Sequence, residues 1–73
     1  MPQLRDISAI TTLAKNVRKY RTEKNMTMEV LANLVGVEYS QVSRIERGVI
    51  NTSVSVIFAI AKALDIEPSK LLE

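Results

Sequence analysis

The chain has 73 residues, a formal net charge of +2, an apolar fraction of 47% and neither cysteine nor histidine. A chain of this length forms a single domain, residues 1–73, and a core this small contributes only about 3–5 kcal/mol of stability. Disulfides, thiolate or imidazole metal sites and the commonest general base are therefore excluded, and we expect no enzyme, no metal, no cofactor and no small-molecule ligand.

Long apolar segments are also missing. No run approaches the ~18 residues of a membrane span, and the N-terminal residues MPQLRDIS lack the apolar region of a signal peptide. We therefore expect a cytoplasmic protein without membrane contact. Glycine and proline occur twice each, and no strand-like alternation appears, so the pattern predicts an all-α fold.

The first predicted helix follows an arm of uncertain order, residues 1–7, and ends near Lys24. Either Asp6 or Ser8 is suited to cap it. Its apolar stripe has the i, i+3, i+4 spacing of a helix face and consists of Ile10, Leu13, Ala14, Val17 and Tyr20. Arg21 lies on this core-facing side, where a charge requires a partner with good hydrogen-bond geometry.

Two short helices joined by a tight turn are predicted over Met28–Arg47. Gly36 interrupts the apolar pattern and can adopt the positive φ that a sharp turn between helices requires. The small side chain of Ala32 allows the helices to approach closely, and Val42 and Ile45 pack the second helix against the first. This is the spacing of a DNA-binding helix-turn-helix.

At these positions the chain resembles the Cro/cI-like (XRE-like) family, and it is similar to restriction–modification controller proteins and small phage repressors. The residues that carry the resemblance are Arg21, Leu31, Ala32, Gly36, Val37, Val42, Ile45, Glu46 and Gly48, followed by the segment AIAKALDI. The resemblance implies a compact five-helix lambda-repressor-like domain with its helix-turn-helix at helices 2 and 3. It also implies an ion pair between Arg21 and Glu46; the alternative is that both side chains are solvated.

The second helix of the motif has a polar face opposite its apolar residues. At about 100° per residue, the outward side chains are those of Tyr39, Ser40, Ser43, Arg44 and Arg47. An α-helix fits the major groove, and the resemblance implies base contacts from Tyr39, Ser40, Arg44 and also Ser43. We expect Arg44 to bond a guanine through O6 and N7. An ordinary solvated helix face is the alternative.

Further side chains around this helix are candidates for phosphate contacts, which position a protein on DNA without reading sequence. They are Arg18, Lys19, Thr27, Arg47, Asn51 and Thr52. Thr27 is also suited to cap the helix that starts at Met28, where the family commonly has Gln. Because Met28 cannot donate a hydrogen bond and the loop after Gly48 is not basic, an alternative function is a small helical protein-interaction module, antitoxin-like, with weak or no DNA specificity.

The fourth predicted helix, Val54–Leu64, follows the N-cap residue Ser53 and is apolar nearly all round. We assign one stripe to the core: Val54, Ile57, Phe58, Ala61 and Leu64. The second stripe needs a cover of its own, and Pro68 starts a short fifth helix. We predict that the second stripe and the C-terminal segment form a homodimer interface through Val56, Ile60, Ala63, Ile66 and Leu71. The alternative is that the N-terminal arm folds back over this stripe.

These features predict a sequence-specific DNA-binding transcriptional regulator that acts at the nucleoid as a homodimer. Two recognition helices related by a two-fold axis would enter successive major grooves about 34 Å apart, so the operator should be a pseudo-palindrome. RNA polymerase is a further partner only if the protein activates transcription, and the sequence identifies no surface for it.

Overall fold

The computed structural model describes residues 5–73, which fold into α-helices and one C-terminal 3-10 helix. In chain order these are α1 (Ile7–Glu23), α2 (Met28–Val35), α3 (Tyr39–Glu46), α4 (Val54–Leu64) and the 3-10 helix η1 (Pro68–Leu71). The described residues contain no strand, so the all-α prediction is confirmed. The predicted fifth helix is a single 3-10 turn that starts at Pro68, as expected, but does not continue as an α-helix.

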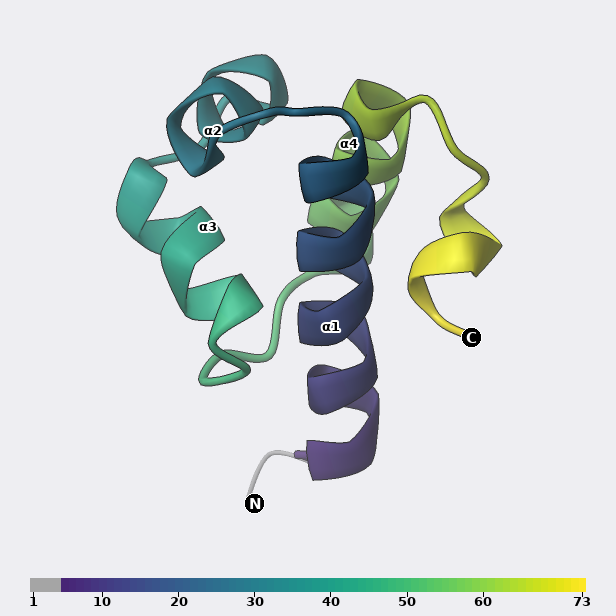
Figure 1. Ribbon diagram of the computed structural model, residues 1–73. Helices are drawn as coiled ribbons and strands as arrows, with labels where there is room; N and C mark the ends of the chain where they lie inside the picture. The colour runs from purple at the N-terminus through teal and green to yellow at the C-terminus, as the bar shows by residue number, and fades with distance from the viewer. Residues whose placement is uncertain (1–4) are drawn as a thin grey trace.

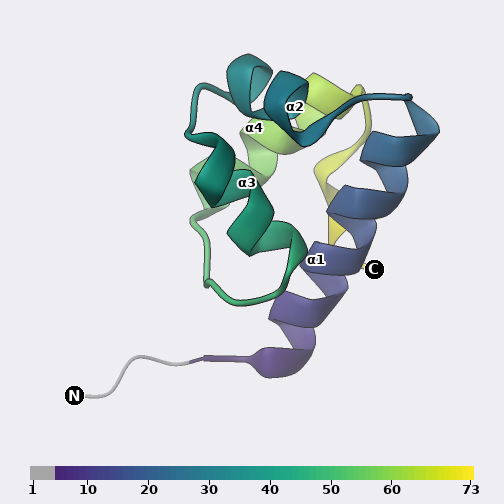
Figure 2. The same cartoon turned by 60° about the vertical axis from the view of Figure 1, so that its left-hand side comes forward.

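The longest helix is α1, whose 17 residues extend over about 25 Å. Figure 1 shows α2 and α3 on one side of α1 and η1 on the other. Helix α3 packs against both α1 and α2, whereas η1 packs against α1 and α4. The view in Figure 2 shows the N-terminal part of α1 extending past the C-terminal end of α3. This arrangement leaves one side of α3 without a neighbouring helix.

Side-chain caps begin three of the α-helices. The Asp6 carboxylate accepts a hydrogen bond from the Ala9 amide at 3.0 Å, the Thr27 hydroxyl from Val30 at 3.1 Å, and the Ser53 hydroxyl from Val56 at 3.2 Å. Each cap satisfies an amide that has no partner inside its helix. Of the two candidate caps for the first helix, the structure selects Asp6, and residues 1–4 of the predicted arm lie outside the described residues.

The turns between helices use residues in the left-handed region. Gly36, at the end of α2, has φ +85°, and its amide donates to the Ala32 carbonyl at 2.8 Å. Asn25 and Asp65 adopt the same region after α1 and α4, with φ of 54° and 56°. Asn and Asp tolerate this conformation better than most non-glycine residues. The turn that the sequence predicted at Gly36 is confirmed.

One core joins the helices and η1. Its buried members are Leu13, Val17, Leu31, Ala32, Val42, Ile45, Ile60, Ala61, Leu64 and Leu71. The predicted core positions of the helix-turn-helix, Ala32, Val42 and Ile45, are all within this set and no more than 2% exposed. Helix α3 is therefore attached to the domain through its apolar face.

The predicted core stripe of α4 is confirmed for Ala61 and Leu64, which are buried, and wrong for Val54 and Phe58. Ile60 is completely buried, whereas Val54 and Phe58 are 69% and 57% exposed. The core face is formed by Ile57, Ile60, Ala61 and Leu64, at the i, i+3, i+4, i+7 spacing, and lies between the two stripes that the sequence suggested. Because almost every position of this helix is apolar, its periodicity does not distinguish one face from another.

Two hydrogen-bond contacts hold the ends of the described chain. The buried amide of Asn16 donates to the carbonyls of Leu71 and Glu73, at 3.0 and 3.1 Å, and so attaches the C-terminal segment to α1. Arg5 donates to the carbonyl of Val49 at 2.9 Å, which places the start of the described chain at the loop between α3 and α4.

Candidate nucleic-acid interface

The orientation of α3 is fixed by the predicted pair between Arg21 and Glu46, which is present in the structure. The Arg21 guanidinium makes two bonds to the Glu46 carboxylate, from Nε at 2.6 Å and from Nη2 at 3.0 Å. Its remaining amino group donates to the Met26 carbonyl at 2.7 Å. Both side chains are largely buried, with 13% and 6% of their surfaces exposed. The pair thus ties α1, the α1–α2 turn and the end of α3 together.

The electrostatics of this pair keep Arg21 charged. The hydrogen bond that Arg21 donates to the Glu46 carboxylate raises the pKa of Arg21 above its ordinary value, despite the opposing effect of burial. A bidentate arginine–carboxylate pair also sets direction as well as distance. The last turn of α3 is therefore held in one orientation relative to α1.

The side of α3 opposite the core is polar and exposed. Tyr39 is 50% exposed, Ser40 and Arg44 are exposed, and Ser43 is partly buried. Within residues 5–73, the side-chain hydrogen bonds and ion pairs that are found do not include the side chains of Tyr39, Ser40, Ser43 or Arg44. Exposed hydroxyl and guanidinium groups of this kind can bond the edges of bases.

The structure brings two of the predicted phosphate contacts together. Arg18 of α1 and Arg47, directly after α3, line the same two adjoining grooves, of about 340 and 240 Å³. The second groove also includes Met28 and Ser43, so it reaches the start of α2 and the outward side of α3. Its floor includes Glu46, whose charge is already paired with Arg21.

The other phosphate candidates are more dispersed. The Lys19 ammonium lies 5.1 Å from the ring centroid of Tyr20, a cation–π distance, and Lys19 lines neither groove. The Thr27 hydroxyl caps α2. Asn51 is exposed and Thr52 partly buried in the α3–α4 loop, where both line a small cleft of about 90 Å³ next to α1.

Lys15 is a cation that the sequence analysis did not select. It lines the larger groove together with Arg18 and Arg47. Its spacing of three residues from Arg18 puts both side chains on one side of α1 and was a usable signal. What the sequence alone did not indicate is that the end of α3 lies opposite this side.

The predicted dimer interface requires correction. Ile60 and Leu71 are completely buried within the protomer, so neither can contact a second copy. Val56, Ala63 and Ile66 are partly buried against the same core. The exposed apolar surface of α4 is instead formed by Val54 and Phe58, and Phe58 borders a groove of about 480 Å³ that is completed by Ala59, Ala61, Lys62, Ile66 and Pro68.

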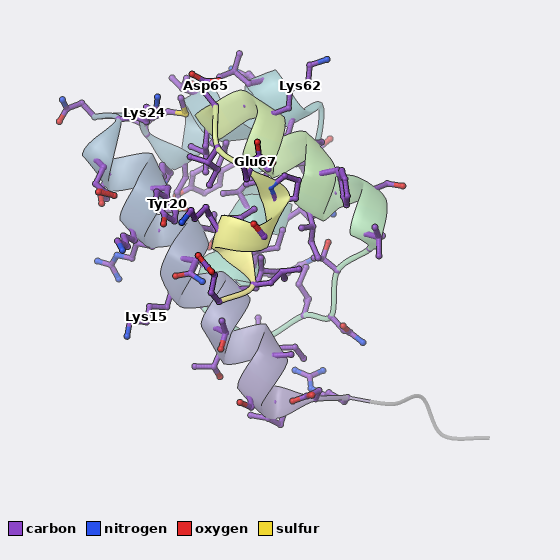
Figure 3. The ribbon with its side chains drawn as sticks, turned by 90° about the vertical axis from the view of Figure 1, so that its right-hand side faces the viewer. Lys15, Tyr20, Lys24, Lys62, Asp65 and Glu67 are labelled. Atoms are coloured by element: carbon purple, nitrogen blue, oxygen red, sulfur yellow. The ribbon has the colours of Figure 1, made fainter. Side chains whose placement is uncertain are left out.

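The side of the molecule that carries η1 has exposed charged side chains. Figure 3 shows Lys24, Lys62, Asp65 and Glu67 on that side, so both signs are present there. None of the helices in residues 5–73 has the length and apolar character needed to cross a membrane.

Comparison with known proteins identifies the same motif. A family model described as helix-turn-helix (HTH_3) matches residues 17–71. The control protein C.SmaI of Serratia marcescens is 38% identical over 60 residues, which cover 82% of this chain and 71% of that protein.

Solved structures agree in fold. The restriction-modification controller protein C.AhdI from Aeromonas hydrophila superposes with a TM-score of 0.84 at 39% identity, over 88% of this chain and 97% of that one. A hypothetical transcription factor, NHTF, from Neisseria has a TM-score of 0.87 at 32% identity, over 100% of this chain and 85% of that one. The chain belongs to the helix-turn-helix family and is a sequence-specific DNA-binding transcriptional regulator.

Proposed function

We propose that the protein acts as a homodimer that places α3 of each copy in the major groove of a pseudo-palindromic operator. The observation that supports this most directly is the outward side of α3, which is polar and largely exposed. Base contacts come from Tyr39, Ser40, Ser43 and Arg44. Arg44 is the residue that reads a guanine, because its planar guanidinium can bond O6 and N7 together.

The proposed phosphate contacts are Arg18, Lys19, Thr27, Arg47, Asn51 and Thr52. Arg18 and Arg47 have the strongest support, since they line one continuous pair of grooves next to the proposed base-reading side chains. These contacts hold the protein in register and supply affinity for any duplex. The proposed activity is DNA binding at the nucleoid, which needs no catalytic group or cofactor.

The proposed dimer contact is the α4 groove, defined here as the surface formed by Phe58, Ala59, Lys62, Ile66 and Pro68. Two features favour a second copy as its occupant. Phe58, a large apolar residue, is 57% exposed, and a 73-residue domain gains stability by association. A two-fold contact is also self-complementary, which suits a groove bordered by an exposed aromatic side chain. RNA polymerase is a second proposed partner only if the regulator activates transcription.

The test is selection of binding sites from random duplex DNA, with the Arg44→Ala variant selected in parallel. We expect a two-fold symmetric motif for the wild-type protein. The variant should keep the symmetry and lose the preference at one base pair in each half-site. If the wild-type protein selects no motif at moderate salt, α3 is not a reader of sequence and the proposal fails.

A further inference from the structure

A band of polar and basic side chains along α1 includes Thr11 and Lys15, which have no role in the interface proposed so far. Thr11, Lys15 and Arg18 follow each other at i, i+4 and i+7 and are all exposed. The opposite side of the same helix is the buried stripe that includes Leu13 and Val17. Thr11 and Lys15 also precede residue 17, where the match to the helix-turn-helix family begins.

The end of α3 lies directly opposite this band. Gly48 has φ +69°, and a side chain added there would meet the Cβ of Ala14 at 3.7 Å. This close approach holds Arg47 across the groove from Lys15 and Arg18. Two of the three cations therefore come from α1 and the third from the residue directly after α3. They meet around one groove, which we name the basic groove: Thr11, Ala14, Lys15, Arg18, Glu46, Arg47 and Gly48.

The charges of the basic groove are not neutralised within the protein. The ion pairs found among residues 5–73 are Arg21–Glu46 and Lys70–Glu73, and neither includes a cation of the groove. The one carboxylate in the lining, Glu46, receives two hydrogen bonds from Arg21. Three neighbouring cations without carboxylate partners attract a polyanion, and their repulsion in the free protein is relieved when one binds.

The shape of the basic groove indicates which kind of polyanion it binds. The basic groove shares Arg18, Glu46 and Arg47 with the second groove, which continues to Met28 and Ser43. The two grooves together form a continuous channel that starts beside the proposed base-reading side of α3 and continues along α1. The sugar-phosphate backbone of a duplex likewise continues beyond the segment of major groove that a helix occupies. A duplex backbone fits this continuity better than a single free anion does.

We propose that the basic groove binds the DNA backbone next to the segment read by α3, with Lys15 and Thr11 as positioning residues that extend the footprint along α1. The Lys15 ammonium and the Arg18 and Arg47 guanidinium groups contact phosphate oxygens, and the Thr11 hydroxyl donates to one. This inference rests on the proposed function, since it requires α3 to occupy the major groove.

The experiment compares Lys15→Gln with Lys24→Gln. Both remove one positive charge from an exposed lysine of the α1 region, and Figure 3 shows Lys15 lower on α1 and Lys24 at its upper end, away from the basic groove. Binding is measured as a function of salt on two duplexes: the motif recovered by selection and a scrambled duplex of the same composition. Unfolding curves verify that both variants fold.

For Lys15→Gln we expect the slope of log K against log salt to become shallower by about 0.9 on both duplexes, the value for one lost phosphate contact. Lys24→Gln should leave the slope unchanged. Ethylation interference should show one phosphate per half-site whose modification weakens the wild-type protein and Lys24→Gln but no longer affects Lys15→Gln. Equal slopes for the wild-type protein and Lys15→Gln, or the same interference pattern, would overturn the inference. Failure of the wild-type protein to bind either duplex would instead overturn the proposed function.

Discussion

Helices α3 and α4 are both short and both cover the same core, yet they present opposite surfaces to their surroundings. The outward side of α3 carries Tyr39, Ser40 and Arg44, whereas that of α4 carries Val54 and Phe58. The first surface is suited to the hydrogen-bonding edges of bases and the second to another apolar surface. One core thus supports two unlike contacts, one proposed for DNA and one for a second copy.

The two helices are also attached differently. Helix α3 combines two buried apolar side chains, Val42 and Ile45, with a buried ion pair at its C-terminal end, whereas α4 is held by three buried apolar side chains, Ile60, Ala61 and Leu64. An ion pair sets direction through its hydrogen bonds, and apolar packing contributes mainly area. The helix that we propose to read bases is therefore the one whose orientation is controlled by a directional contact.

The largest effect is expected from breaking the attachment of α3. Arg21→Ala leaves the Glu46 carboxylate buried and unpaired, and should lower the free energy of unfolding by about 3–5 kcal/mol. Because the hydrogen bond to Glu46 raises the pKa of Arg21, the contribution of the charged arginine to stability is lost as the pH rises to strongly alkaline values. Urea unfolding of Arg21→Ala, Glu46→Ala and the double variant measures the coupling. Independent, additive losses would show that the pair does not hold α3.

The next comparison lies within α4. Ile60→Ala should cost about 2–5 kcal/mol, because Ile60 is completely buried, whereas Phe58→Ala should cost about 1 kcal/mol or less. Phe58→Glu should instead weaken dimerisation at least about tenfold, measured by sedimentation equilibrium. A dimer of unchanged affinity in Phe58→Glu would remove the α4 groove as the proposed contact.

A smaller effect, in binding rather than folding, is expected on the outward side of α3. Arg44→Ala should leave stability nearly unchanged and reduce discrimination at one base pair by about 1–3 kcal/mol. Arg47→Ala provides the matched control, since it should weaken binding to all duplexes about equally and make the salt dependence shallower by about one phosphate contact. Competition binding with single-base operator variants distinguishes a loss of base preference from a uniform loss of affinity. Loss of base preference in Arg47→Ala but not in Arg44→Ala would reverse the assignment.

The smallest effects concern the helix starts. The Ser53 hydroxyl caps α4, whereas Glu38, at the corresponding position of α3, makes no side-chain cap. Ser53→Ala should destabilise the protein by about 1 kcal/mol, and Glu38→Ser should stabilise it by about 0.5 kcal/mol by supplying a missing cap. Thermal unfolding in dilute buffer measures both. Shifts of the same sign would mean that capping does not distinguish the two helices.

Much of the interface was predictable because its signals are local. The turn at Gly36, the caps at Thr27 and Ser53 and the inward side of α3 depend on neighbouring residues in the chain, so spacing and side-chain chemistry indicate them directly. The resemblance to a known family added the partner of Arg21, which lies 25 positions further along the chain and has no local signal. The roles of Tyr39, Ser40, Ser43 and Arg44 toward DNA remain predictions.

The sequence by itself determined the α-helices, the caps at Thr27 and Ser53 and the polar side of α3, since these follow from contacts within a few residues. Only the tertiary structure decided which face of α4 meets the core, that Asn16 holds the C-terminal segment, and that Lys15 lies opposite Arg47. The physical reason is that burial of apolar surface has no direction. A helix with apolar residues on every side can pack equally well in several orientations, and contacts between distant parts of the chain select one of them.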